Sequence, residues 1–169
     1  MGLPSKLKDF NLFNDGANYL GLVPELTMPK LSRKMEEYIA GGMSGPIEVD
    51  YHTEKIEFDW TAGGLLVDAL LQYGAVTHNA VQLRFAGAYQ NDDTAEVTAV
   101  EIVVRGRHKE IEMGSAKMAD KSDQKYKTTC SYYKLIINGQ DIIEIDFING
   151  VEIVGGIDRR AELRAAIGM

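Results

Sequence analysis

The sequence has few of the residues and motifs that catalytic, metal-binding or membrane proteins require. Its 169 residues include one cysteine, Cys130, so no intramolecular disulfide can form and the fold does not depend on oxidation. No apolar run approaches the roughly 18 residues of a membrane span. Residues 1–6 lack the apolar stretch of a signal peptide. We therefore expect a protein that is made and folded in the cytoplasm, with no signal peptide and no membrane span.

Basic residues are fewer than acidic residues. The chain has 18 Lys and Arg against 25 Asp and Glu, a formal net charge of −7. Binding to nucleic acid through its phosphates requires a basic surface, so this balance disfavours such binding. The one basic cluster, residues 105–109, has glutamates on both sides and is expected to pair with them.

Catalytic and metal-binding motifs are missing. The three histidines have neither zinc-finger nor HExxH spacing, and Cys130 has no CxxC partner. The glycine-rich residues 41–45 match neither the GxSxG nucleophile elbow nor a phosphate-binding loop. We predict no catalytic residue, no cofactor and no metal. Cys130 lies within a strand pattern and is predicted to be a buried, inert thiol.

What the sequence does contain is the alternation typical of β-strands. Apolar and polar residues alternate along 47–51 and 56–60, and the polar link 52–55 predicts that these two strands form a hairpin. The apolar phase slips near Gly106, which predicts a β-bulge there. Asn138-Gly139 is a strong hairpin signal. Further strands are predicted at 81–89, 97–113, 126–137 and 143–147.

Two helices are predicted beside these strands. Leucines and alanine recur at helical spacing over 65–73, and Gly74 offers a stop. Asp158 is positioned to cap a short C-terminal helix over 159–166, which Gly168 would close.

The N-terminal third has a different pattern. A strand is expected at 7–12, but Pro24 and Pro29 interrupt the extended stretch that follows, and 41–46 must be a loop. We predict one domain, in which residues 1–46 are an extended arm and loop that make contacts between subunits. Residues 47–169 are predicted to be the β-core.

Carboxylates occupy alternate positions of the predicted strands, in two rows. The first row comprises Glu48, Asp50, Glu57 and Asp59, and the second comprises Glu144 and Asp146. A solvated acidic face and the acidic lining of a channel are both compatible with this pattern. A carboxylate hydrolase on a β-scaffold is the enzymatic alternative, because glycoside hydrolysis uses two carboxylates in different environments.

An ordered set of short segments gives the chain a family resemblance. These segments are residues 11–16 (NLFNDG), 26–31 (LTMPKL), 34–38 (KMEEY), 40–43 (AGGM), 105–110 (RGRHKE), 131–135 (SYYKL), 144–146 (EID) and the ending 164–169. No single segment is diagnostic, but their order over nearly the whole chain is specific. Taken together, they resemble the major tail tube proteins of contractile-tailed bacteriophages and the tubes of phage-derived tailocins.

The resemblance implies a β-sandwich or barrel-like subunit with a flanking helix and no catalytic residue. Six subunits would form a ring, and rings would stack into a tube, in a virion tail or a tailocin particle assembled in a bacterial host. Two hairpins per subunit would join neighbours in a continuous inner β-barrel. The implied partners are the tail sheath protein, the tape measure protein, the baseplate tube initiator and the tail terminator, with DNA only in transit through the lumen.

The resemblance also implies where neighbouring rings meet. The N-terminal arm and a long loop would bridge them, with candidate contacts at Leu12, Phe13, Met28, Pro29, Tyr38, Gly41, Gly42 and Met43. Either acidic row could line the channel, where it would repel DNA phosphates. The alternative is a related ring-forming protein, either the tube protein of a secretion system or a tail terminator or completion protein.

Overall fold

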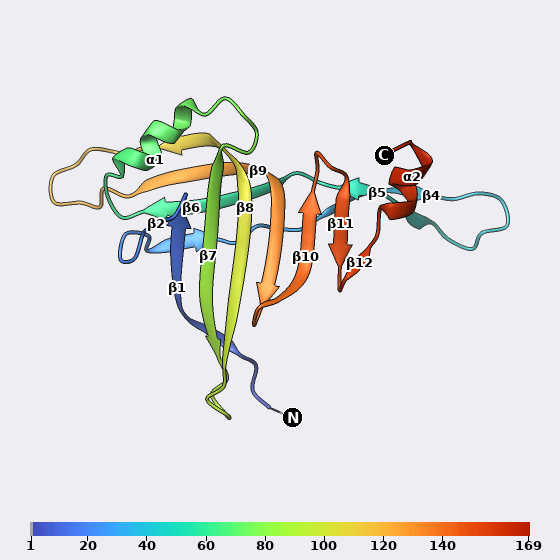
Figure 1. Cartoon of the computed structure of the whole chain (residues 1–169), viewed down its shortest axis with the longest axis horizontal. Helices are drawn as coiled ribbons and strands as arrows, with labels where there is room; N and C mark the ends of the chain where they lie inside the picture. Colours follow the sequence, from blue (N-terminus) through green and yellow to red (C-terminus); the bar gives the residue numbers. More distant parts are fainter. Residues whose placement is uncertain (1) are drawn as a thin grey trace.

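A computed structural model describes residues 2–169 as a mainly β protein with short helices (Figure 1). The helical elements are α1 (Val67–Leu71), the 3-10 turn η1 (Gln72–Gly74) and α2 (Ala161–Ala166). The strands are β1 (Lys6–Asn14), β2 (Ala17–Asn18), β3 (Glu25–Thr27), β4 (Arg33–Tyr38), β5 (Ile47–Thr53), β6 (Ile56–Ala62), β7 (Val81–Gln90), β8 (Val97–Glu112), β9 (Gln124–Ile137), β10 (Gln140–Asp146), β11 (Val151–Val154) and β12 (Ile157–Asp158).

Ten of these strands form one sheet that folds over itself. Its main path runs β12-β11-β10-β9-β8-β7-β1-β2, while β6 attaches to β9 and carries β3 on its other edge. Figure 1 shows β6 and the first half of β9 crossing over β1, β7 and β8. The two halves therefore enclose one core, as the layers of a sandwich do. None of the helices within 2–169 is long and apolar enough to cross a membrane.

The long strands β8 and β9 belong to both halves and bend between them. Up to Arg105, β8 pairs with β7 and with the second half of β9; from Gly106 onward it pairs with the first half of β9. The register shifts between Arg105 and Gly106, which confirms the predicted bulge. A Cβ at Gly106 would overlap the carbonyl oxygen of Thr129, so only glycine fits this crossing.

Alternate residues of β6 supply the centre of the core. Ile56, Phe58, Trp60 and Ala62 are all buried, and the Trp60 ring stacks on Tyr126 of β9 with centroids 4.2 Å apart. Aromatic pairs in this offset geometry stabilise beyond the area they bury. The prediction that Cys130 is buried is confirmed, and burial raises the pKa of its thiol to about 12.

A buried polar network fastens the helical segment to the core. His108 of β8 is buried, with Nδ1 2.9 Å from the Thr128 hydroxyl and Nε2 2.9 Å from Oε1 of Gln72 in η1. The Gln72 amide nitrogen donates to Asn14 Oδ1 at 2.7 Å and to an Asp15 carboxylate oxygen at 2.8 Å. Burial lowers the pKa of His108 to about 4, so the imidazole is neutral at pH 7.

The predicted hairpin between residues 47–51 and 56–60 is wrong. β5 pairs with β4 in a separate two-stranded sheet, whereas β6 pairs with β3 and β9. Figure 1 shows β5 and β6 running one after the other in the same direction. Alternation places side chains on a face but does not choose the neighbouring strand, and the polar link proved to be a connector and not a turn.

The N-terminal third also differs from the prediction. β1 lies in the main sheet beside β7, and β3 pairs with β6, so much of residues 1–46 belongs to the core layer. Leu12 and Tyr19 are buried in that core. Within residues 33–46, β4 and the loop after it join β5 in a separate two-stranded sheet that projects from the main one.

The C-terminal helix exists but is shorter than predicted, and Asp158 is not its cap. The residue before the helix is Arg160, and no side chain caps the helix. Asp158 lies in β12, where it accepts a hydrogen bond from the Arg160 amide at 3.0 Å and forms an ion pair with Arg164. The carboxylate therefore holds α2 against the sheet from outside the helix.

Candidate assembly and channel surfaces

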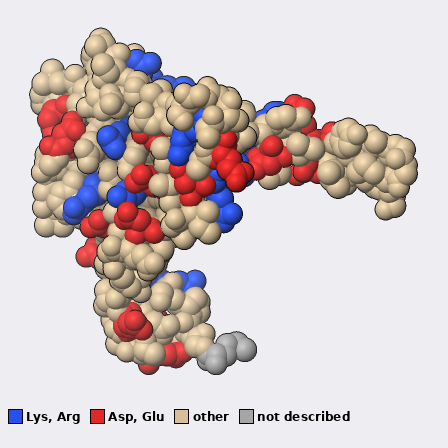
Figure 2. Space-filling view, turned by 45° about the vertical axis from the view of Figure 1, so that its right-hand side comes forward, with Lys and Arg blue, Asp and Glu red and all other residues tan. Residues whose placement is uncertain are grey.

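The two-stranded sheet of β4 and β5 projects from the rest of the subunit (Figures 1 and 2). We call residues 33–53 the projecting hairpin. Every residue of β4 is exposed, and so is nearly all of β5. The base is anchored by Arg33, which pairs with Asp50 at 2.6 Å and with the buried Glu152 of β11. An isolated two-stranded ribbon is marginal in water, so the outer part of this hairpin needs a further surface to pack on.

The two faces of the projecting hairpin differ: one is mostly apolar, with Glu36 across from Val49 as an acidic residue on it, and the other is acidic. Ile47, Val49 and Tyr51 alternate along β5, and Tyr38 faces Ile47 across the pair. These four side chains are 37–58% exposed. On the opposite face Glu37 stands directly across from Glu48, with Asp50 next to it along the strand. Like charges in cross-strand register destabilise a ribbon, so this face favours a cationic partner.

The tip of the hairpin carries no charge. Residues 38–47 contain no acidic or basic side chain, and Figure 2 shows the end of the projection free of both. Gly42 has a φ of +89°, and the Met43 amide donates to the Ala40 carbonyl to close the loop. Four of the predicted contacts, Tyr38, Gly41, Gly42 and Met43, therefore lie together on this projection.

The other predicted contacts lie elsewhere. Leu12 has no exposed surface and packs in the core of its own subunit, so its assignment as a contact is corrected. Phe13 lies beneath the Arg84 guanidinium, 4.4 Å from the ring centroid. Met28 is half-buried, with its sulfur 3.7 Å from the Tyr89 hydroxyl, and Pro29 beside it is also half-buried.

The first acidic row is divided by the fold. Glu48 and Asp50 lie on the projecting hairpin, whereas Glu57 and Asp59 lie on β6 in the main sheet. Glu57 is 3.1 Å from Lys109 Nζ and 3.2 Å from Lys55 Nζ. The hydrogen bond from Lys109 lowers the pKa of Glu57. These four carboxylates do not form one continuous acidic surface.

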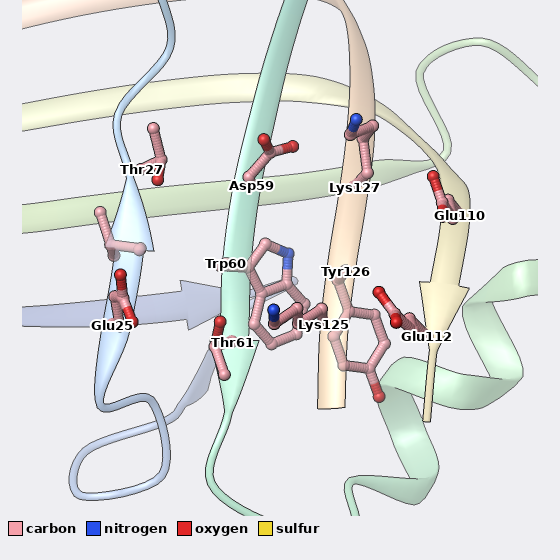
Figure 3. A pocket seen from close by; sticks show the side chains of 11 residues that line it. Glu25, Thr27, Asp59, Trp60, Thr61, Glu110, Glu112, Lys125, Tyr126 and Lys127 are labelled. Atoms are coloured by element: carbon pink, nitrogen blue, oxygen red, sulfur yellow. The ribbon is translucent and has the colours of Figure 1, made fainter. Parts of the chain in front are cut away.

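Asp59 borders a hollow on the layer formed by β3, β6 and the first half of β9 (Figure 3). Strand register places Thr27, Asp59 and Lys127 in one row across β3, β6 and β9. The hollow has a volume of about 320 Å³ and is also lined by Glu25, Glu110, Glu112 and Lys125. Its charges alternate in sign, which is typical of a hydrated sheet face.

The second acidic row lies on the layer formed by β7, β8, the second half of β9 and β10, on the face opposite the core. Register places Glu144, Lys134 and Arg84 in one row across β10, β9, β8 and β7. Asp146, Tyr132 and Arg105 form the adjacent row, in which the Arg105 guanidinium lies 3.8 Å from the Tyr132 ring centroid. We call these two rows the open face. The open face carries both signs of charge, so its carboxylates do not form the uninterrupted acidic surface that the sequence pattern alone allowed.

Each carboxylate of the open face has a local partner. Glu144 accepts a hydrogen bond from the Tyr132 hydroxyl at 3.0 Å and lies 3.6 Å from Lys134 Nζ. Asp146 accepts hydrogen bonds from the amides of Ile148 and Asn149 and so shapes the turn after β10. Neither carboxylate stands alone as a charge poised for acid or base chemistry.

An apolar surface around α1 was not predicted from the sequence patterns. Helical spacing predicted a helix over 65–73, and the α-helix is shorter, spanning Val67–Leu71. Ala69, Leu66 and Leu70 contact the core. The remaining large apolar residues face outward: Leu65, Val67, Leu71, Tyr73 and Val76 are 60–86% exposed. We call these five residues the helix patch. The available signal was that large apolar residues stand on more than one side of this segment, with Asp68 as its one charged residue. This pattern is typical of a helix that is covered on more than one side.

Comparison with known proteins gives consistent matches over the whole chain. The family model for phage tail tube protein FII matches residues 4–168. The chain is 40% identical to the tail tube protein of Escherichia phage P2 over the full length of both proteins. It is 36% identical to the major tail tube protein of Serratia phage KSP20, over 88% of this chain and 86% of the relative.

Solved structures share the fold at low sequence identity. The sheath/tube terminator of the PVC extracellular contractile injection system aligns with a TM-score of 0.60 and 12% identity, over 80% of this chain and 97% of that chain. A chain of the PVC sheath-tube complex aligns with a TM-score of 0.58 and 12% identity, over 80% and 91%. The tube-terminating cap of the anti-feeding prophage gives 0.60 and 10% identity, over 80% and 93%.

Proposed function

Because the chain belongs to the phage tail tube protein FII family and is therefore a structural tail tube protein of contractile phage-like systems, we propose that six copies close into a ring and that rings stack into a hollow tube. The projecting hairpin is the observation that carries the proposal. It extends beyond the subunit with a mostly apolar face and an uncharged tip that its own chain leaves uncovered. A neighbouring copy in a stack supplies the missing cover.

The open face is proposed to line the channel. The opposite face of the same layer is occupied by the core, and the outer edge of β1 is paired by β2 only at Phe13 and Asn14. Closing such a layer with its neighbours in a ring removes its free edges. On this wall Glu144 and Asp146 are interspersed with Lys134, Arg84 and Arg105. Because carboxylates interrupt the basic residues of the open face, it would attract passing DNA less than a continuous basic surface would.

The proposed setting is that of a non-enzymatic virion or tailocin component. The tube assembles in the bacterial host cytoplasm and is driven through the host envelope, where it conducts DNA or acts as a pore. The sheath protein surrounds the tube, and the tape measure protein occupies the lumen during assembly. The baseplate tube initiator and the tail terminator bind the two ends of the tube.

Electron microscopy of the purified protein tests this proposal. Hollow tubes of uniform diameter with six-fold symmetry in cross-section are the expected result. Isolated rings that never stack would instead indicate a terminator or completion protein, and a protein that stays monomeric at every concentration would contradict the proposal.

Neutralising the carboxylates of the open face is expected to leave assembly intact. Glu144→Gln and Asp146→Asn keep hydrogen-bonding groups in place, and exposed ion pairs contribute only about 0–1 kcal/mol. Tube yield and length, measured by sedimentation and negative-stain microscopy, should match the parent protein. Lys134→Gln on the same face is the matched control for a change of opposite sign. If both neutral carboxylate variants form rings that fail to stack, the open face lies at a subunit contact and not in the channel.

A further inference from the structure

The neck of the projecting hairpin, where it joins the subunit, is held at few points. β4 and β5 pair with each other and, within residues 2–169, with no strand of the main sheet. The chain enters the hairpin through residues 28–32 and leaves it through residues 54–55, and the Glu54 amide donates to the Ser32 carbonyl at 2.7 Å. These two connections therefore lie side by side. They define an axis but leave rotation about it free, so a third attachment is needed to fix the direction of the hairpin.

Arg33 supplies that third attachment. Its guanidinium pairs with Asp50 of β5 at 2.6 Å and with Glu152 of β11 in the main sheet. Among the ion pairs within residues 2–169, only Arg33–Glu152 joins the hairpin to the main sheet. Glu152 is 8% exposed, and a buried carboxylate that loses its cation is strongly disfavoured. The pair therefore resists separation more than an exposed ion pair would.

The space around this ion pair is incompletely packed. One hollow, of about 280 Å³, is lined by His52 from β5 and by Val151 from β11. A second hollow, of about 460 Å³, is lined by Tyr51 from β5 and by Leu163 from α2. Glu152 lines both, so the ion pair lies between two spaces that side chains leave unfilled. Because apolar packing is sparse on both sides, the ion pair is the main contact that can hold the neck.

A β-bulge lies beside Arg33 in the hairpin. The register of β4 and β5 shifts after Lys34, which leaves Tyr51 without a cross-strand partner. A bulge bends a strand pair and redirects its side chains. Across this bulge, the Arg33 Nε donates to Asp50 while Nη1 donates to Glu152. Asp50 thereby orients the guanidinium toward the main sheet.

We propose that Arg33 is a positioning residue: by joining Asp50 of the hairpin to Glu152 of the main sheet, it fixes the angle at which the projecting hairpin leaves the subunit. We call these three residues the Arg33 clamp. The clamp is a property of a single subunit and forms before any second copy is met. Its consequence rests on the proposed tube function, because a hairpin held at one angle is preorganised for assembly and lowers the ordering cost of association.

Double electron–electron resonance on the dilute, unassembled full chain tests the clamp. Spin labels on Tyr38→Cys at the end of β4 and Val97→Cys at the start of β8 report the angle, since both positions are exposed. The native Cys130 is buried and is not labelled. We expect one narrow distance distribution in the labelled parent and a distribution at least twice as wide after Arg33→Gln. Arg107→Gln is the matched control and should keep the narrow distribution, because Arg107 is exposed and forms no ion pair within residues 2–169.

Variants of the two carboxylates separate the contact with the main sheet from the contact within the hairpin. Glu152→Ala should widen the distribution as Arg33→Gln does, because it removes the partner in the main sheet. Asp50→Asn should leave the distribution narrow, because its amide oxygen still accepts a hydrogen bond from Arg33. Trp60 fluorescence verifies that the core of each variant is intact.

The rate of tube formation, followed by light scattering, tests the consequence of the clamp. Arg33→Gln should slow tube formation about ten-fold or more, because a hairpin that rotates freely seldom points in the direction that assembly requires. A rate equal to that of the parent would overturn the role of the clamp in assembly.

The outcomes separate this inference from the proposed function. Narrow distributions in both Arg33→Gln and Glu152→Ala, or a wide distribution in the parent, would overturn the clamp and leave the tube function standing. A parent protein that shows the clamp but forms no tube under any condition would remove the proposed function itself.

Discussion

Replacing Gly106 with alanine is expected to destabilise the subunit by about 4 kcal/mol or more, a loss reserved for severe steric and packing defects. The added Cβ would overlap the Thr129 carbonyl oxygen and lie 2.8 Å from the carbonyl carbon of Thr129 and 2.9 Å from the Cα of Cys130. These are backbone atoms of the paired strand, so no side chain can rotate to make room. The two halves of the sheet would separate at the bend. Urea denaturation followed by tryptophan fluorescence measures the change, since Trp60 lies in the adjoining core.

A matched glycine gives the control for this substitution. A Cβ at Gly64 would meet no atom within 4 Å, and its φ lies outside the left-handed region. Gly64→Ala should therefore change the free energy of unfolding by less than about 1 kcal/mol, and in the stabilising direction through the unfolded state. If Gly106→Ala folds with a stability within 1 kcal/mol of the parent, then β8 and β9 do not cross as closely as described.

Acidification is expected to destabilise the subunit through His108. Burial lowers the pKa of His108 from 6.5 to about 4, and the nearby Asp15 opposes this shift only in part. Below pH 6.5 His108 binds a proton in the unfolded chain but not in the folded chain. The free energy of unfolding therefore falls as the pH falls. The loss continues until the folded-state pKa near 4 and amounts to about 3 kcal/mol, at 1.36 kcal/mol per pKa unit.

Comparison of variants isolates this contribution from that of the carboxylates. His108→Gln cannot take up the proton, so its free energy of unfolding should fall by about 3 kcal/mol less than that of the parent between pH 7 and pH 4. His78 is exposed, and His78→Gln should retain the full loss. Equal pH profiles for His108→Gln and the parent would show that His108 is not buried in its neutral form.

Local patterns in the sequence were sufficient for much of this molecule. Alternation located the strands from residue 81 to residue 146, the break in phase located the bulge at Gly106, and Cys130 was correctly predicted to be buried. These features are local, because the alternation of apolar and polar residues along a single strand shows which of its side chains face the core. The ordered segments also sufficed to identify the family.

Other features depended on which segments meet, and only the tertiary structure decided them. It placed β5 against β4 and β6 against β9, and it put Leu12 in the core when the N-terminal third was expected to be an arm. It divided one acidic row between two sheets and left Leu71 and Val76 on the surface. The physical reason is that an apolar side chain indicates that a position is buried, but it does not indicate which segment or which molecule packs against it. A position buried by its own chain and one buried by a second copy have the same sequence pattern, and long-range pairing alone separates them.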